Sequence, residues 1–448
     1  MLPLDFGGDL AHRTHGEFVG LYLSKLKFKN IRGFNEFELS FDGPKKHRQW
    51  TIFIGDNGHG KTTILRAIAL GLGDERTTSE LLGQLPGDFI RINKRGLRSA
   101  PGRIELTLKD SETQILTTIT TELTMDTHGG VTVNKSVSDS GFQWAKVFVC
   151  GYGANRGIGG RVYSEFELRN ALLTLFSDKA GLLDPESVLR DFALKSAQEK
   201  NPTANDPLKQ MKSYLWKLWS LNANHQLEVT AEHIVIHGPW GGMPFHALGD
   251  GYRGTGSWLL DLMGNCVKSG RWNSELSGIV LLDEMDEHLH PRWQKELVPK
   301  LRKLLPNIQF VATTHSPLAI VNTEFGELYA TRLHNAVAEL VPDALQPPDG
   351  RSANEILMGE WFGLESTLDN QSERLLKRYR KAFKEGNSVA LAKLEPLLHQ
   401  RVRSFLPPDF LKIDQSDIDG GTEISPEQKE QLIAAAALRR QQALKSGK

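Results

Sequence analysis

Residues 50–72, WTIFIGDNGHGKTTILRAIALGL, connect a short apolar run to a helical pattern through a glycine-rich loop. The run from Trp50 to Ile54 has the length of a buried strand, and residues 62–72 place apolar side chains at helical spacing. The loop between them, Gly55 to Thr62, fits the pattern G-x-x-x-x-G-K-[ST] at every fixed position. This strand–loop–helix stretch predicts a site for the phosphates of a nucleotide.

The fixed positions of the loop each have a physical task. Glycines let the backbone wrap around phosphates with its N–H groups inward, and the start of the helix adds a field that favours negative charge. We expect Lys61 to bridge the β- and γ-phosphates of ATP and Thr62 to bind Mg²⁺. The predicted nucleotide-binding residues here are Gly55, Asn57, Gly58, Gly60, Lys61, Thr62 and Thr63. A glycine-rich turn that matches by chance is the alternative, and the flanking strand and helix weigh against it.

Two further apolar runs end in side chains that suit the same chemistry. Residues 279–284, IVLLDE, place two carboxylates at the end of a predicted buried strand. We expect Asp283 to bind the Mg²⁺ and Glu284 to polarise the attacking water. His315 follows a second buried run, residues 308–314, where it could reach the γ-phosphate and the water. The predicted catalytic residues are therefore Glu284 and His315.

Carboxylates and histidines are dense after this strand, which leaves a metal-dependent nuclease centre as an alternative. Its candidate ligands are Asp283, Glu284, Asp286, Glu287, His288 and His290. We prefer the nucleotide site, because it already explains where the two leading carboxylates lie.

The phosphate loop (P-loop), the LLDE strand end, the stretch from Asp286 to Pro291 and His315 together resemble the SMC-like branch of the ABC ATPases. The resemblance implies an α/β fold with a mixed sheet, an antiparallel β subdomain, a short helical insert and a C-terminal helical region. It places the ATPase domain at residues 18–345, with the insert at about 164–225, and the C-terminal region at 346–448.

In this branch, a signature motif on one subunit closes over the γ-phosphate held by the other. Residues 248–253, LGDGYR, resemble that motif, so Gly249 and Gly251 are expected to contact the nucleotide. The family pattern has Ser where this chain has Gly249, and the missing hydroxyl removes a hydrogen bond worth about 1.5–3 kcal/mol. The resemblance therefore implies slow hydrolysis in a head-to-tail homodimer or a higher even oligomer, with Asp286 in the D-loop at the interface.

The segment from Tyr152 to Arg156, YGANR, resembles an element found at this point in related ATPases. Asn155 or Arg156 could contact the nucleotide or its water, and a purely structural turn is the equal alternative.

Periodicity predicts several other elements outside the P-loop unit. They are a strand-like stretch at Leu227 to His237, and helices at Gly251 to Val267, Pro291 to Leu305, Glu373 to Lys384 and Val389 to Phe405, with a last helix that begins at Ser425-Pro426-Glu427-Gln428.

The short insert excludes the long coiled-coil arms that other members of the branch use to bridge DNA. Residues 354–357, residues 361–364 and the paired helices after them resemble the compact PtuA-type ATPases of bacterial Septu and retron antiphage systems. That resemblance implies a separate partner nuclease of the HNH type and a role in antiviral defence. A DNA-repair ATPase that acts directly on DNA is the alternative, and a nucleotide-binding subunit of a transporter fits less well.

Composition narrows the remaining possibilities. The chain has 448 residues, with 54 Lys and Arg against 54 Asp and Glu, which argues against a surface coated with DNA throughout. Two cysteines in apolar surroundings, Cys150 and Cys266, suggest reduced buried thiols, and with no apolar run of membrane-spanning length we expect a cytoplasmic protein.

Local basic stretches still allow contact with DNA phosphates, although a solvated loop is the simpler interpretation of each. One stretch is Lys45, Lys46, His47 and Arg48, and the other is Arg91, Lys94, Arg95, Arg98 and Arg103.

Overall fold

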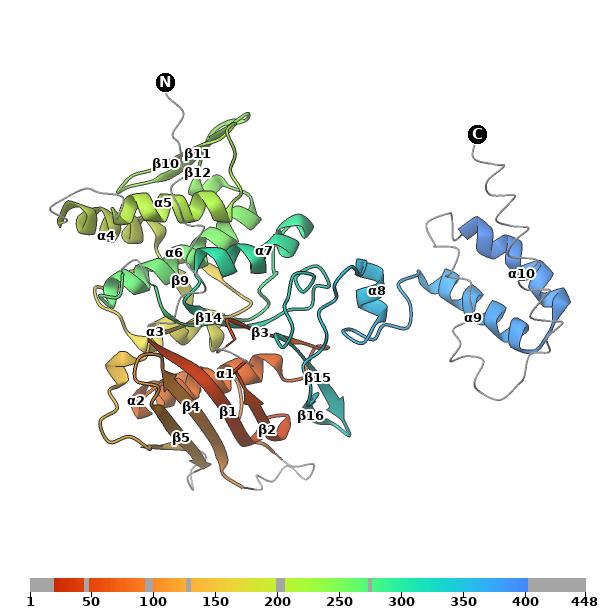
Figure 1. The fold of residues 1–448 in the computed structure, drawn as a ribbon, viewed down its shortest axis with the longest axis horizontal. Helices are drawn as coiled ribbons and strands as arrows, with labels where there is room; N and C mark the ends of the chain where they lie inside the picture. Colours follow the sequence, from red (N-terminus) through yellow and green to blue (C-terminus); the bar gives the residue numbers. More distant parts are fainter. Residues whose placement is uncertain are drawn as a thin grey trace. The chain divides into compact units, whose positions relative to one another are not determined.

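The computed structural model describes residues 20–43, 48–92, 100–125, 130–198, 206–272 and 276–401 (Figure 1). The chain divides into two compact units, Met1–Leu364 and Glu365–Lys448. The first unit includes α8 (Ala353–Met358), whose Ile356 is fully buried in its core, and the indole of Trp361 donates a hydrogen bond to the carbonyl of Gln346 at 2.8 Å. Because these contacts tie residues 346–364 to the first unit, the division falls later than the expected boundary at residue 345.

A six-stranded sheet forms the centre of the first unit, in the order β16-β15-β3-β14-β13-β7. All neighbouring pairs are parallel except β15 with β16. The strands are β3 (Trp50–Ile54), β7 (Val149–Tyr152), β13 (Gly278–Leu282), β14 (Ile308–Thr313), β15 (Leu328–His334) and β16 (Val337–Leu340). Since parallel strands end at the same edge, the residues after β3, β13 and β14 emerge together.

The three middle strands of this sheet are buried along their whole length, as their apolar sequences predict. Alternate side chains face different cores. Phe53, Leu281 and Val311 belong to the core around α1 (Lys61–Leu72), whereas Ile52 and Leu282 belong to the core under the other helices. The sheet is therefore covered by helices on both faces.

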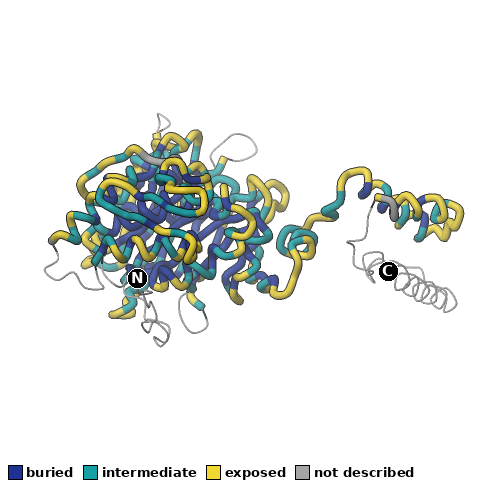
Figure 2. Tube along the Cα trace, turned by 90° about the horizontal axis from the view of Figure 1, so that it is seen from above, coloured by how far each residue is buried: buried dark blue, intermediate teal, exposed yellow. Residues whose placement is uncertain are grey.

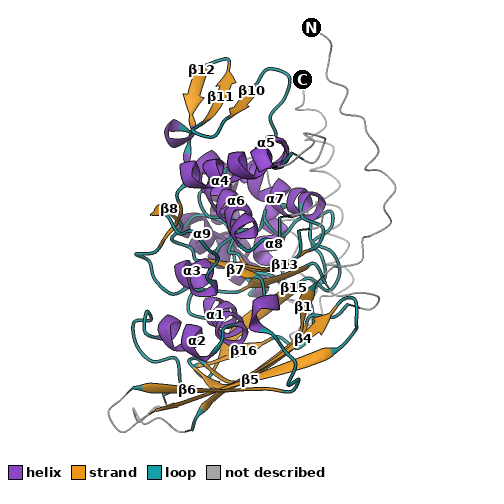
Figure 3. Cartoon of the chain, turned by 90° about the vertical axis from the view of Figure 1, so that its left-hand side faces the viewer, coloured by secondary structure: helices purple, strands orange, loops and turns teal. Residues whose placement is uncertain are grey.

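A second, antiparallel sheet packs on the far side of α1, in the order β2-β1-β4-β5-β6. Its strands are β1 (Leu21–Ile31), β2 (Phe34–Ser40), β4 (Gly102–Asp110), β5 (Leu116–Met125) and β6 (Val131–Val137). The helix α1 touches strands of both sheets and lies between them, with α2 (Glu75–Leu82) beside it (Figure 3). This arrangement is the mixed sheet with an antiparallel β subdomain that the sequence predicted.

Helices cover the opposite face of the central sheet (Figure 3). They are α4 (Pro185–Gln198), α5 (Pro207–Leu218), α6 (Asp250–Lys268) and α7 (Pro291–Leu304). The helix α3 (Leu168–Leu172) packs against the edge strand β7 and contributes Leu172 to the core around α1, and the short strands β8 (Gly157–Arg161) and β9 (Gly181–Leu183) precede and follow it. The predicted helices at 251–267 and 291–305 are confirmed as α6 and α7. None of the helices in the described ranges is long and apolar enough to cross a membrane.

The prediction of one strand-like stretch at 227–237 is wrong in detail. The chain forms β10 (Gln226–Val229) and β11 (Ile234–Gly238), which pair antiparallel and continue to β12 (Gly241–Pro244). The Thr230 hydroxyl accepts hydrogen bonds from the amides of Glu232 and His233, both at 3.2 Å, and these bonds close the turn. A threonine that satisfies turn amides therefore interrupts an apolar run that periodicity alone joins.

The second unit contains α9 (Asn370–Lys384) and α10 (Ser388–Arg401), which pack against each other. Gly386, with φ 62°, takes the left-handed conformation between them. Burial along the described trace is densest in the first unit, and within residues 365–401 of the second unit only a few side chains, such as Leu376 and Leu398, are buried (Figure 2). The predicted helix that begins at Ser425 lies outside the described residues.

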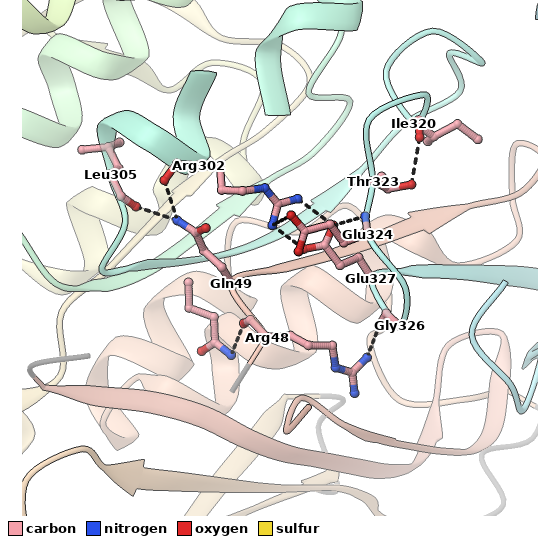
Figure 4. Close-up of polar contacts among 10 residues, drawn as sticks. Arg48, Gln49, Arg302, Leu305, Ile320, Thr323, Glu324, Gly326 and Glu327 are labelled. Carbon is pink, nitrogen blue, oxygen red and sulfur yellow. Dashed lines mark hydrogen bonds and ion pairs between the residues drawn. The ribbon is translucent and has the colours of Figure 1, made fainter. Parts of the chain in front are cut away.

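Polar contacts hold the residues just before β3 against the C-terminal end of α7 and against the segment before β15 (Figure 4). Arg302 makes two hydrogen bonds to the Glu327 carboxylate, at 2.7 and 2.8 Å, and the Gln49 amide donates to the Leu305 carbonyl at 2.9 Å. Arg48 donates to the Gly326 carbonyl at 2.6 Å. Arg48 therefore has a structural partner, whereas Lys45, Lys46 and His47 lie outside the described residues.

The second basic stretch is described only in part, since Lys94, Arg95 and Arg98 lie outside the described residues. Arg91 donates to the Gly33 carbonyl at 2.6 Å, and Arg103 pairs with Glu105 and Glu122 at 2.7 and 3.0 Å. These two arginines thus have partners within the fold.

Lys135 on β6 caps the end of the P-loop helix. Its ammonium donates to the Leu70 carbonyl at 2.7 Å and to the Thr121 hydroxyl at 2.8 Å. Burial lowers the pKa of Lys135 to about 7. The folded chain therefore holds this amine largely neutral in mildly alkaline solution, where an unfolded chain would protonate it.

We predict that Lys135 makes stability rise with pH. Between its folded pKa of about 7 and the unfolded value near 10.4, the unfolded chain binds more protons, so the free energy of unfolding should increase by about 2 kcal/mol from pH 6.5 to 8.5. Chemical denaturation of the wild type and of Lys135→Met across this range measures the effect. Parallel pH profiles for the two proteins would contradict it.

Candidate functional site

The P-loop takes a shape that only glycines permit. Gly55, Gly58 and Gly60 have φ of 142°, 81° and 86°. A Cβ on Gly60 would lie 2.3 Å from the ring of Phe34, and one on Gly55 would lie 2.4 Å from the carbonyl of Thr331. The loop is therefore pressed against β2 and β15, and α1 starts directly after Gly60.

Lys61 folds back onto the loop that precedes it. Its ammonium donates to the carbonyls of Gly55, at 2.7 Å, and Asp56, at 3.0 Å. Burial lowers the pKa of this lysine. Asn57 is exposed in the loop, whereas Thr63 is buried in the first turn of α1. The cation and the helix start together give the loop the character of a phosphate site.

The residues predicted to bind Mg²⁺ meet at the end of β13. The Thr62 hydroxyl donates to one oxygen of Asp283 at 2.7 Å, and the Thr313 hydroxyl donates to the other at 2.6 Å. Asp283 is buried, with 5% of its surface exposed. A hydroxyl beside a buried carboxylate supplies the hard oxygen donors that Mg²⁺ prefers, so this pair fits the metal.

Glu284 has an unusual backbone conformation. Its φ is 46°, in the left-handed region that non-glycine residues rarely adopt, and its amide donates to the Thr313 hydroxyl at 2.8 Å. Burial raises the pKa of its carboxyl group, and the nearby carboxylates of Asp283 and Glu287 add to that effect. A carboxylate of raised pKa is a better proton acceptor for a water molecule.

His315 lies at the end of β14, next to the same group of charges. Burial lowers its pKa, and the charge of Lys61 lowers it further, so the imidazole is neutral at physiological pH. The flanking residues are held in place: Thr314 donates to Asp286, and Ser316 donates to Gln294 at 2.7 Å. The structure thus brings His315 to the edge where the P-loop and Asp283 meet.

The signature segment lies in a different setting. Gly249 is the N-cap of α6 and uses no side chain to cap it. Gly249 and Gly251 line an open groove of about 450 Å³ with the segment from His288 to Trp293. The rings of Tyr252 and Trp293 meet edge to face in this groove, with centroids 4.6 Å apart. The signature glycines therefore share a surface with the D-loop segment, not with the lining of the P-loop.

The nuclease-centre alternative gains no support. No group of three or more His, Cys, Asp or Glu side chains within the described ranges is arranged to hold a metal ion. The Asp286 carboxylate accepts a hydrogen bond from Thr314, His288 lies 3.5 Å from Glu287, and the His290 ring accepts a hydrogen bond from the Arg292 amide at 3.3 Å. These side chains belong to loop structure around the nucleotide edge.

Sequence reasoning gave no role to Thr313, and it left open whether Arg156 contacts the nucleotide or only shapes a turn. Thr313 joins Asp283 to the Glu284 amide, and its only signal in sequence is a hydroxyl at the last position of an apolar strand. Arg156 donates to the main chain of Asp283 and Glu284, so the structure gives it a main-chain partner where contact with the nucleotide was one expectation. Asn155 beside it is exposed.

Two family models match the chain. One, described as "AAA domain", matches residues 25–152, and the other, described as "AAA domain, putative AbiEii toxin, Type IV TA system", matches residues 196–322. The first match contains the P-loop. The second contains the signature segment, Asp283, Glu284 and His315.

Curated relatives are named for Septu and retron systems. Septu protein PtuA of Bacillus mycoides is 26% identical over 364 residues, which cover 80% of this chain and 47% of the relative. The Retron Vc95 probable ATPase of Vibrio cholerae is 34% identical over 111 residues, 24% of this chain and 21% of the relative. The chain thus spans about half the length of the first relative and less of the second.

Solved structures give weaker likenesses. The SMC head domain from Thermotoga maritima aligns with a TM-score of 0.42 and 16% identity, over 72% of this chain and 99% of that one. An SMC head bound to the C-terminal winged-helix domain of ScpA gives 0.46 and 14%, over 71% and 97%. Both family models fall on the segments that build the phosphate loop and the carboxylate-bearing strand, so the chain carries the P-loop ATPase motifs of AAA domains in both segments and is similar to the PtuA protein of a Septu system.

Proposed function

We propose that this chain binds ATP with Mg²⁺, hydrolyses it slowly between two copies of itself, and controls a separate nuclease in antiphage defence. The observation that carries the two-copy proposal is the position of the signature glycines. They line a groove with the D-loop segment, whereas the P-loop, Asp283, Glu284 and His315 gather at the end of the central strands. A second chain placed head to tail would bring its signature to this edge.

Each side chain at the edge has a defined task in this proposal. Lys61 binds the β- and γ-phosphates, and Thr62 with Asp283 holds the Mg²⁺, which neutralises phosphate charge. Glu284 orients the attacking water and accepts its proton. The neutral imidazole of His315 donates a hydrogen bond to the γ-phosphate. Positioning and electrostatics supply most of the rate in phosphoryl transfer.

Gly249 is the reason for proposing slow hydrolysis. The backbone N–H groups at the start of α6 remain available to the γ-phosphate bound by the partner chain. The serine hydroxyl of the family pattern is missing, because position 249 is glycine. A lost hydrogen bond to a charged group costs about 1.5–3 kcal/mol, which corresponds to a rate lower by roughly 10- to 150-fold if the bond forms only in the transition state. The nucleotide would then persist long enough to act as a signal.

The partner and the setting follow from the relatives. The curated relatives are named for Septu and retron systems, and the described part of this chain offers no metal-binding nuclease centre of its own. We therefore assign cleavage to a separate HNH-type nuclease that responds to the ATP-bound state. The two buried free thiols, Cys150 and Cys266, suit a reducing cytoplasm.

The first test is turnover and assembly of the purified chain. We expect the wild type to hydrolyse ATP slowly, and Glu284→Gln to bind ATP but lose at least about 100-fold in turnover, because the base is gone. The trapped ATP should convert this variant to a stable dimer, measured by light scattering after size exclusion. Lys61→Ala is the control that neither binds ATP nor dimerises.

Two results would contradict the proposal. If the wild-type protein binds ATP but does not hydrolyse it, the proposed hydrolysis is wrong. If the Glu284→Gln protein stays monomeric at saturating ATP, the proposed site between two chains is wrong. Turnover that requires DNA would favour the direct-acting DNA-repair function over control of a nuclease.

Gly249→Ser should raise turnover. A Cβ at this position meets no atom within 4 Å, and serine is a favoured N-cap residue, so the new hydroxyl fits without strain. We expect an increase of roughly 10-fold or more in kcat, since the added donor is worth about 1.5 kcal/mol or more against a charged group. Gly249→Ala is the matched control without a hydroxyl. Equal rates for the two variants would show that the missing donor does not limit hydrolysis.

A further inference from the structure

Arg156 stands between β7 and the catalytic edge. It follows the strand by a short turn, and its Nε donates to the Gly153 carbonyl at 2.9 Å. Gly153 lies close against the main chain of Thr174, since a Cβ at this glycine would lie 2.1 Å from the Thr174 carbonyl. Because β7 pairs with β13, the guanidinium lies beside the end of that neighbouring strand.

One terminal nitrogen of Arg156 joins both peptides that flank the α-carbon of Glu284. Its Nη2 donates to the Asp283 carbonyl at 2.6 Å and to the Glu284 carbonyl at 2.5 Å. These two carbonyls belong to the peptide before Glu284 and the peptide after it. Together with the Thr313 hydroxyl, which accepts from the Glu284 amide, the guanidinium fixes the main chain on both sides of this residue.

The conformation that results is a strained one. Glu284 has φ 46°, and for a residue with a Cβ the left-handed region costs about 1–2 kcal/mol. Such a conformation persists only where surrounding contacts determine it. Two charge-assisted hydrogen bonds from one guanidinium are together strong enough to offset that cost.

The charges around Arg156 explain why a guanidinium is tolerated there. Burial lowers the pKa of Arg156, and the carboxylates of Glu287, Asp283, Asp286 and Glu284 oppose that effect. The side chain therefore remains a cation, and its hydrogen bonds go to the main chain of the catalytic segment.

We propose that Arg156 is a positioning residue for Glu284. It acts through the Asp283–Glu284 main chain, sets the direction in which the Glu284 carboxylate leaves β13, and does not touch the nucleotide. The expected effect on kcat rests on the proposed ATP hydrolysis. The expected effect on the Glu284 backbone rests on geometry alone.

The kinetic test combines substitutions at both positions. Arg156→Met should lower kcat by on the order of 100-fold, as expected when a catalytic group is misplaced by about an ångström, with affinity for ATP unchanged within about threefold. Arg156→Lys should recover part of the rate, since an ammonium can still donate to a carbonyl. In the Glu284→Gln background, Arg156→Met should cause no further loss, because it acts through the carboxylate that is already absent.

Arg161→Met is the matched control, since Arg161 also donates to a carbonyl, that of Asn170 at 3.1 Å, but away from the catalytic segment. It should keep kcat within about threefold. A fall in ATP affinity that parallels kcat in Arg156→Met would place the guanidinium on the nucleotide and overturn the inference. An equal loss in the Glu284→Gln background would do the same.

A crystal structure of Arg156→Met, or of Arg156→Lys if the first variant does not fold, tests the inference without turnover. We expect Glu284 to leave the left-handed region in Arg156→Met and to keep it in Arg156→Lys. If Glu284 retains φ near 46° in Arg156→Met, or loses it in Arg156→Lys, Arg156 does not position it through hydrogen bonds to the two carbonyls. Failure of the wild type to hydrolyse ATP would overturn the proposed function alone, because this structural result stands apart from it.

Discussion

The parallel pairing of β3, β14 and β13 is the constraint on which the rest of the site depends. Ala312 of β14 pairs with Ile52 on one side and with Leu282 on the other, so the three strands end at one level. The P-loop, the two carboxylates and His315 therefore emerge at a single edge, although 221 positions separate Thr62 from Asp283. The hydrogen bonds from Thr62 and Thr313 to Asp283 join the three strand ends.

Sequence patterns were sufficient to predict those strands, helices and side chains whose positions depend on residues close by in the chain. Buried strands read as continuous apolar runs, and each functional side chain directly follows one, so Lys61, Thr62, Asp283 and Glu284 could be placed before any coordinates. The helix that begins after Gly249 was predictable for the same reason, since its apolar spacing is regular.

The remaining features depend on contacts between distant segments, which periodicity does not report. Arg156 meets the main chain of β13 only because β7 pairs beside that strand, and Thr313 becomes a hydrogen-bond bridge only through the neighbouring Asp283. The turn at Thr230 and the extension of the first unit to Leu364 arise from side-chain contacts of the same kind. Likewise, the sequence pattern of this chain does not show that the signature glycines lie apart from the P-loop of the same chain.

The central claim is that each nucleotide is enclosed by the P-loop of one chain and the signature of another. Mixing Lys61→Ala with Gly251→Asp measures this directly; the space beside Gly251 accepts a Cβ, whose nearest atoms lie 3.6 Å away. Each variant alone should be inactive, because Lys61→Ala cannot bind ATP and Gly251→Asp lacks the signature. An equal mixture should recover turnover, since in a mixed dimer the P-loop of the Gly251→Asp chain meets the intact signature of the Lys61→Ala chain and forms one complete site. A mixture as inactive as its components would contradict the account.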